Sequence, residues 1–178
     1  MDKFMTPILE DGPIRLVPFG SQYLTSRYVG WLNDPATMRY SENRHYVHTL
    51  ESCQDYFRSM KRDKNYFWAI LDRESHIGNV TAHIDYPNRV ADIGILVGEA
   101  SARGHGAGYR AWRLACDFLL KEAGMRKVTA GTMSENRPML KIMRSIGMVE
   151  EGRRIGQFLL DGKEADLIMA ALFTPPDR

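Results

Sequence analysis

The spacing of apolar and polar positions predicts that the chain opens with one short strand and two helices. Residues 14–19 alternate as a strand. A helical stretch begins at Ser21, carries apolar residues three and four positions apart, and stops before Pro35. Residues 38–48 are polar and show no period. Thr49 is a suitable N-cap, so a second helix is expected to begin there.

The pattern then changes to strands alternating with helices. It predicts strands over 66–71, 77–85, 91–97 and 127–133, helices over 109–123 and 135–146, and a closing hairpin over 149–173. Residues 91–97 are almost continuously apolar, which indicates burial on both faces. Asp161-Gly162 is a hairpin turn signal, and Pro175-Pro176 is expected to end the fold. The central strand–helix–strand unit predicts parallel pairing in the middle of the sheet.

This order defines an α+β class, and 178 residues are expected to form a single domain over 1–178. A net charge of +2 gives no footprint for nucleic acid. The sequence has no apolar run of about 18 residues, so no membrane span is expected. The first residues do not read as a secretory leader, which makes the cytoplasm the expected location.

Cysteine and histidine spacing offers little catalytic or metal chemistry. Cys53 and Cys116 are too few for a disulfide framework, and neither has an evident partner base. His45 and His48 have no third ligand at a useful spacing, so no metal is expected.

A glycine-rich loop, Arg103-Gly104-His105-Gly106-Ala107-Gly108, separates a buried strand from a long helix. Glycine at every second position lets successive N–H groups converge, and the helix adds its free amides and the positive end of its dipole. The pattern favours a phosphate or pyrophosphate ligand over a plain turn. Arg103 could add a charge-assisted contact.

Two common phosphate motifs are excluded by particular residues. A nucleoside-triphosphate loop needs Gly-Lys-Ser/Thr, but Tyr109 and Arg110 follow Gly108. A dinucleotide fingerprint would need its third glycine at position 109, which is tyrosine. It also needs an acidic residue at the end of the next strand, and the strand that opens around Val128 lacks one.

The loop that remains resembles the Arg/Gln-x-x-Gly-x-Gly/Ala motif of the GNAT superfamily of acyl-CoA N-acyltransferases, through Arg103, Gly106 and Gly108. A second family feature is Asn136 leading a helix that ends at Gly147-Met148. The order and spacing match across residues 90–152. The ribosomal-protein and amino-sugar-nucleotide acetyltransferase branches are the most similar.

The resemblance implies a mostly antiparallel sheet of six to seven strands, splayed in the middle and flanked by about four helices. Acetyl-CoA would be the cosubstrate. Its pantetheine arm would lie along Leu96, Val97 and Gly98, and its pyrophosphate on the loop from Arg103 to Gly108, with Gly104, His105, Gly106 and Ala107 between them. Asn136 would contact the arm, although an N-cap role explains it equally well.

Acyl transfer needs a neutral amine, a positioned thioester and a fate for the thiolate. The resemblance suggests Asp92 as base or proton relay, and a main-chain N–H near Leu96 or Val97 as the carbonyl's donor. Where the family often has a tyrosine acid, this chain has Met143, which carries no acidic proton. Ser134, a water or unassisted departure would replace it.

Acceptor groups are expected from the early helices and their connection: Trp31, Arg39, Tyr40 and Asn43, with His83 from the preceding strand. Aromatic, amide and arginine groups suit a nucleotide-linked amino sugar, although a solvated connector explains them equally well. A protein N-terminus or a polyamine is the alternative acceptor. An acyl-CoA-binding module without activity is the alternative of another class. By analogy, the last strands allow a homodimer.

Overall fold

The computed structural model describes residues 4–174, so the expected stop at Pro175-Pro176 lies outside the described residues. The strands are β1 (Leu9–Asp11), β2 (Ile14–Pro18), β3 (Tyr66–Asp72), β4 (Ser75–Asp85), β5 (Val90–Val97), β6 (Lys127–Met133), β7 (Val149–Leu160) and β8 (Lys163–Phe173). The helices are α1 (Ser26–Asn33), α2 (Leu50–Arg62), α3 (Ala107–Lys121) and α4 (Arg137–Ser145). Three short 3-10 turns are η1 (Ser21–Tyr23), η2 (Glu42–His45) and η3 (Ala100–Ala102).

The strands form one eight-stranded sheet in the order β1-β2-β3-β4-β5-β6-β8-β7. The β5–β6 pair is parallel, as the central strand–helix–strand unit predicted, and the other pairs among residues 4–174 are antiparallel. The mixed α+β fold is therefore confirmed. The sheet has one strand more than the six to seven expected, because β1 is only three residues long and too short to show a period.

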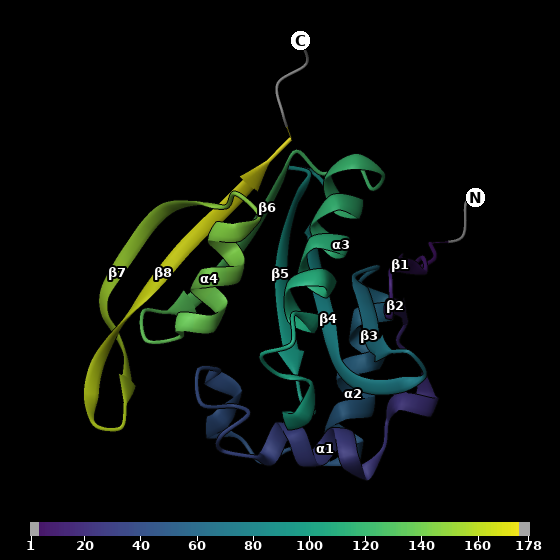
Figure 1. Ribbon diagram of the computed structural model, residues 1–178, viewed down its shortest axis with the longest axis horizontal. Helices are drawn as coiled ribbons and strands as arrows, with labels where there is room; N and C mark the ends of the chain where they lie inside the picture. The colour runs from purple at the N-terminus through teal and green to yellow at the C-terminus, as the bar shows by residue number, and fades with distance from the viewer. Residues whose placement is uncertain (1–3, 175–178) are drawn as a thin grey trace.

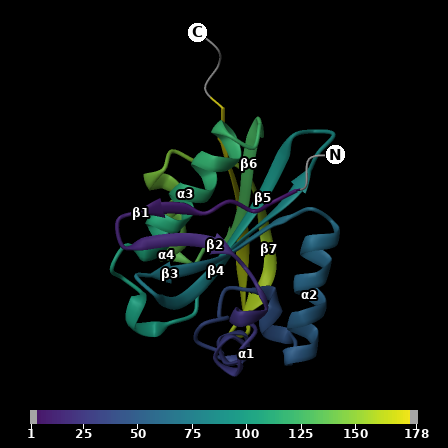
Figure 2. The ribbon, with the colours of Figure 1, turned by 90° about the vertical axis from the view of Figure 1, so that its right-hand side faces the viewer.

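Helices cover both faces of the sheet, with α3 and α4 on one side and α2 on the other (Figure 2). The apolar face of α3, centred on Ala111, Trp112 and Ala115, packs against the sheet in the main core. A second core gathers Tyr28 and Trp31 of α1 with residues of α2 and β3. Figure 1 shows α1 and the segment after it crossing the end of the sheet at which β5 and β6 lie apart.

Local chemistry explains most element ends. Thr49 caps α2: its Oγ1 accepts from the Ser52 N–H (3.1 Å), and Ser52 Oγ accepts from the Thr49 N–H (2.9 Å). The expected hairpin turn has positive φ at Asp161 (51°) and Gly162 (75°). The first helix begins later than expected, at Ser26, because Thr25 caps it through the Tyr28 N–H (3.2 Å).

Candidate active site

A cavity of about 1410 Å³ opens where the sheet splits. β5 pairs with β4 along its whole length, but with β6 only over Val90–Asp92, opposite Lys127–Thr129. Beyond Asp92 the two strands diverge (Figure 1), and residues 93–97 have no partner strand on that side. The expectation that residues 91–97 are buried on both faces is therefore wrong, since Ile95 to Val97 line the cavity and are only half-buried.

The glycine loop closes one end of this cavity. Gly104 (φ 79°) and Gly106 (φ 84°) adopt left-handed conformations, and Gly106 is the N-cap of α3 with no side-chain cap bond. Within residues 4–174, the main-chain N–H groups from Gly104 to Tyr109 have no hydrogen-bond partner. Such a run of free amides at a helix start is suited to an anion.

Some residues of the loop line the cavity and others do not. Gly104, Gly106 and Gly108 line it. Ala107 is buried in the core at 5% exposure, so only its main chain can reach a ligand. His105 is exposed and does not line the cavity.

Arg103 lines the cavity, but its guanidinium is occupied by protein atoms. It donates to the main-chain oxygens of Val97 (2.9 Å) and Gly98 (3.0 Å) and to Thr37 Oγ1 (2.6 Å). Arg103 therefore holds the loop against the end of β5 and against the segment after α1, where sequence reasoning expected a contact with pyrophosphate.

Helix α4 supplies a wall that sequence reasoning largely missed. Pro138, Lys141, Ile142 and Ser145 line the cavity, at the i, i+3, i+4 and i+7 spacing that a helical wheel places on one face, and Ile142 lies against Gly108 of the loop. Asn136 lines it too and is also the N-cap of α4, accepting from the Met139 N–H (3.3 Å) and donating to Thr132 Oγ1 (2.9 Å). Met143 instead lies in the core at 2% exposure.

Two buried polar atoms of the cavity wall have no protein partner. Trp112 is 1% exposed and its indole N–H is unpaired, while Asn79 is 7% exposed and its amide oxygen is unpaired. Both residues line the cavity. A buried donor or acceptor without a partner costs about 1–3 kcal/mol, so each atom calls for a ligand or water. The Trp112 N–H, together with the free loop amides, fits a ligand that carries both phosphates and amide groups, as coenzyme A does.

The remaining wall, formed by α1, α2, β4 and the segment between the helices, is rich in neutral polar groups. Its side chains include Tyr28, Tyr40, Ser41, Asn43, Ser52, Cys53, Tyr56, Asn79 and Thr81. Burial raises the pKa of Tyr28, of Tyr56 and of Cys53, so all three keep their protons at neutral pH. Among the described residues, Glu42 is the only carboxylate on the cavity wall, and Arg44 pairs with it at 2.7 Å.

Of the expected acceptor residues, Tyr40 and Asn43 line the cavity, whereas Trp31 and Arg39 do not. Trp31 is 8% exposed and covers Gly98, where an added Cβ would lie 2.0 Å from the indole Cδ2. Arg39 pairs with Asp161 in the β7–β8 turn at 2.5 Å. The sequence alone could not show that Trp31 packs on Gly98 or that Arg39 pairs with Asp161, because both contacts join distant parts of the chain.

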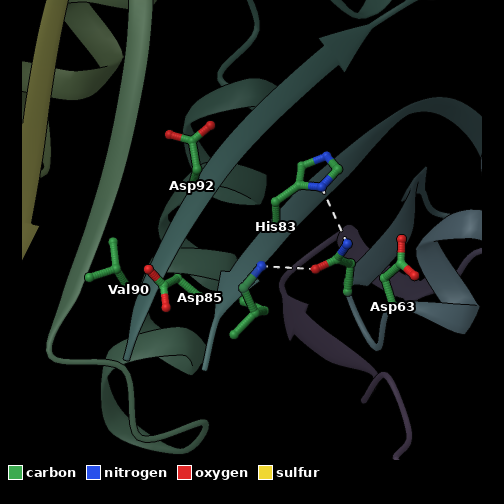
Figure 3. Close-up of a pocket in the computed structure, with 7 residues that line it drawn as sticks. Asp63, His83, Asp85, Val90 and Asp92 are labelled. Carbon is green, nitrogen blue, oxygen red and sulfur yellow. Dashed lines mark hydrogen bonds between the residues drawn. The ribbon is translucent and has the colours of Figure 1, made fainter. Parts of the chain in front are cut away.

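Asp92 and His83 lie opposite each other on β5 and β4 and line a separate, smaller hollow of about 370 Å³. In Figure 3, His83 lies between Asp92 and Asp63, with Asp85 nearby. Asp92 accepts from Thr129 Oγ1 at 2.7 Å. The expected base and one expected acceptor residue are therefore together, but outside the large cavity.

Ser134, the other residue expected to move a proton, lies at the end of β6. Its hydroxyl donates to Glu135 Oε2 (2.9 Å) and accepts from the Asp166 N–H (3.2 Å). It does not line the large cavity. Its hydrogen bonds fit a role in joining β6 to β8.

Comparison with known proteins supplies the family. Residues 14–149 match the family model for the acetyltransferase (GNAT) domain. The chain is 24% identical over 151 residues to an N-acetyltransferase 9-like protein from Nematostella vectensis, covering 77% of this chain and 75% of that protein.

Solved structures share the whole fold. RimL, a ribosomal L7/L12 α-N-protein acetyltransferase solved with coenzyme A, superposes with a TM-score of 0.84 at 16% identity, over 96% of this chain and 100% of that one. A spermidine N-acetyltransferase from Vibrio cholerae, solved with coenzyme A and spermine, gives 0.82 at 19% identity, over 92% and 97%.

The chain therefore belongs to the GNAT acetyltransferase family. It is an acyl-CoA-dependent N-acetyltransferase, with acetyl-CoA as the cosubstrate that supplies the acetyl group to an amine. The alternative of a binding module without activity is set aside on this ground. In residues 4–174 no helix is both long and apolar enough to cross a bilayer.

Proposed function

We propose that the acceptor is a small, hydroxyl-rich primary amine, best represented by an amino sugar, free or linked to a nucleotide. The observation that carries this proposal is the chemistry of the acceptor wall. It offers hydroxyls, amides and aromatic rings, and its one carboxylate among residues 4–174, that of Glu42, is already paired with Arg44. A hydroxylated ring can exchange hydrogen bonds with such groups without needing an opposite charge.

In this proposal the loop from Gly104 to Gly108 and the N-terminus of α3 hold the pyrophosphate, and Lys141 lies beside them as a cation. The unpaired edge of β5 at Leu96 and Val97 holds the pantetheine arm and presents a main-chain donor to the thioester carbonyl. Asn79, on the strand next to Leu96, offers its free oxygen to the N–H of the amine. Asp92 and Ser134 take no direct part, because neither lines the cavity.

The nucleotide part of the acceptor has less support than the sugar. Arg39 is bound to Asp161, and Arg44 donates to Glu42 and to the Leu159 main-chain oxygen (3.0 Å), so neither is free for a diphosphate.

One observation favours a second candidate, a polyamine. The small hollow carries the carboxylates of Asp63, Asp85 and Asp92 and lies next to Tyr56 of the large cavity, through His83. A distal ammonium could pair with this acidic group while the reacting amine occupies the cavity. The family relationship also keeps a protein N-terminus in the comparison.

A thiol-release assay with acetyl-CoA against four acceptor classes tests the proposal. These are free amino sugars, their UDP and dTDP conjugates, N-terminal peptides, and spermidine. We expect the highest kcat/KM with an amino sugar. A higher kcat/KM with spermidine or with a peptide would refute the proposed acceptor class but not the acetyltransferase assignment.

A further inference from the structure

A chain of hydrogen bonds leads from the small hollow into the large cavity. The Ile84 N–H donates to Asn65 Oδ1 (2.8 Å), and Asn65 Nδ2 lies 3.3 Å from His83 Nδ1 (Figure 3). On the other side of the ring, His83 Nε2 lies 3.3 Å from the hydroxyl oxygen of Tyr56. Tyr56 lines the large cavity, so the chain ends there.

The Ile84 main-chain N–H, at one end of this series of hydrogen bonds, determines which group donates in each of them. A main-chain N–H can only donate, so it must meet the amide oxygen of Asn65, which leaves the amide nitrogen facing His83. That nitrogen can only donate, so His83 Nδ1 must be free of a proton and Nε2 must carry one. Nε2 therefore donates to the Tyr56 oxygen, and the hydrogen of Tyr56 is free to point into the cavity.

The charged groups around His83 do not reverse this direction. Asp92 on β5, Asp85 on β4 and Asp63 after α2 share its hollow, but no hydrogen bond among the described residues joins any of these carboxylates to a ring nitrogen of His83. Burial raises the pKa of the Tyr56 hydroxyl, partly opposed by the Thr81 hydroxyl, so Tyr56 keeps its proton at neutral pH.

We propose that Tyr56 donates this proton to the leaving thiolate. It would thereby take the role of the tyrosine that the family often has at the position of Met143, whose side chain carries no acidic proton. The amine nitrogen bonds to the thioester carbon, the carbon–sulfur bond breaks with its electron pair on sulfur, and sulfur takes the hydrogen of Tyr56. His83 Nε2–H stabilises the resulting phenolate. The proton that nitrogen loses returns to the phenolate directly or through water, so the reaction needs no other reagent. This role rests on acyl transfer, as proposed above, but not on which amine is the acceptor.

The kinetic test compares Tyr56→Phe, Asn65→Asp and the double variant, using any amine that the wild type acetylates. Tyr56→Phe should lower kcat about 100-fold, within the range for loss of a general acid, and leave the Kd of coenzyme A unchanged. Asn65→Asp keeps the acceptor for Ile84 but offers a carboxylate to Nδ1. In this variant the proton of the neutral His83 ring moves to Nδ1, and Nε2 then accepts the hydrogen of Tyr56.

Asn65→Asp separates this role from a structural one, because it leaves Tyr56 and His83 in place and changes only which ring nitrogen carries the proton. Its kcat should fall toward the Tyr56→Phe level, and its Kd for coenzyme A should not change. The double variant should be no slower than Tyr56→Phe alone, because both changes remove one function. Tyr46→Phe, which alters an exposed hydroxyl outside the cavity wall, is the matched control.

Nitrogen-15 NMR of His83 tests the direction of the chain without turnover. We expect the proton on Nε2 in the neutral wild-type ring and on Nδ1 in neutral Asn65→Asp. A proton on Nδ1 in the wild type, or a normal kcat for Tyr56→Phe, would overturn the role of Tyr56 alone. A wild type that binds coenzyme A but acetylates no amine would refute the proposed function together with this role.

Discussion

Gly106 is the residue at which the proposed anion site depends most on a single backbone conformation. Its φ of 84° places it in the left-handed region, and no atom lies within 4 Å of where a Cβ would stand. Gly106→Asp should therefore fold, but its carboxylate should repel the pyrophosphate and weaken coenzyme A binding at least 10-fold by calorimetry. Gly124→Asp is the matched control, since Gly124 has φ 73° and open space at the other end of α3. Equal affinities in the two variants would contradict the loop assignment.

Trp112 gives a second prediction about the cofactor. Because its buried N–H has no protein partner, Trp112→Phe removes no hydrogen bond from the protein without ligand. If the N–H donates to an amide oxygen of the pantetheine arm, the variant should lose about 1 kcal/mol of binding, a roughly five-fold rise in Kd. Desulfo-coenzyme A, which keeps both amides, should show the same rise. An unchanged Kd would mean that the indole N–H does not bind the arm.

His76 makes the stability of the α1 side of the fold depend on pH. Its ring packs against those of Tyr23 (4.7 Å) and Trp31 (5.1 Å), and burial lowers the pKa of His76 from 6.5 to about 4, with nearby Arg27 contributing. The unfolded chain therefore binds a proton between these values that the folded chain does not. Stability should be complete above pH 7 and should fall as pH drops from 6.5 to 4.

Urea unfolding at pH 7.5 and pH 5 measures this effect. The wild type should lose about 2 kcal/mol more between the two pH values than His76→Leu, which has no titrating group there. Carboxylates are common to both proteins and cancel in the comparison. An equal loss in both would show that the folded His76 takes up its proton as easily as the unfolded one.

At the level of elements, the sequence predicted most of what regular patterns and turn chemistry determine. β6 and the β7–β8 hairpin lie at the expected residues, and Thr49 and Asn136 cap α2 and α4 as expected. Helix α3 begins at Ala107, two residues before the expected start at residue 109, with Gly106 as its N-cap. The splay was implied by family resemblance and is confirmed, because the parallel pairing stops at Asp92.

The contents of the cavity were harder to predict than its frame. Trp112 and Asn79 carry the free polar atoms of the wall, yet their positions on an apolar helix face and in a strand read only as core. Tyr56 likewise fits the apolar face of α2, and its meeting with His83 joins residues 27 positions apart. Such contacts depend on how α2 is placed against β4, and the spacing of apolar residues within either element does not determine that placement.

At the scale of the whole molecule, the proposed acceptor end of the cavity is bordered by segments far apart in the chain. Arg39 follows α1, and its partner Asp161 lies in the β7–β8 turn, 122 residues later. Both side chains are about half exposed or more, so the pair should add under about 1 kcal/mol to stability. The pair should instead act by holding the β7–β8 hairpin and the segment after α1 in place around the acceptor.

Charge changes at this pair test that role. Arg39→Asp and Asp161→Arg should each raise the KM for the amine several-fold by separating the two segments, and the exchanged double variant should restore it. The Kd of coenzyme A, which we propose binds at the other end of the cavity, should not change. If Arg39 instead bound the diphosphate of a nucleotide sugar, Asp161→Arg would not imitate Arg39→Asp, and the exchange would restore nothing. The same four proteins therefore decide whether the acceptor carries a nucleotide that Arg39 binds.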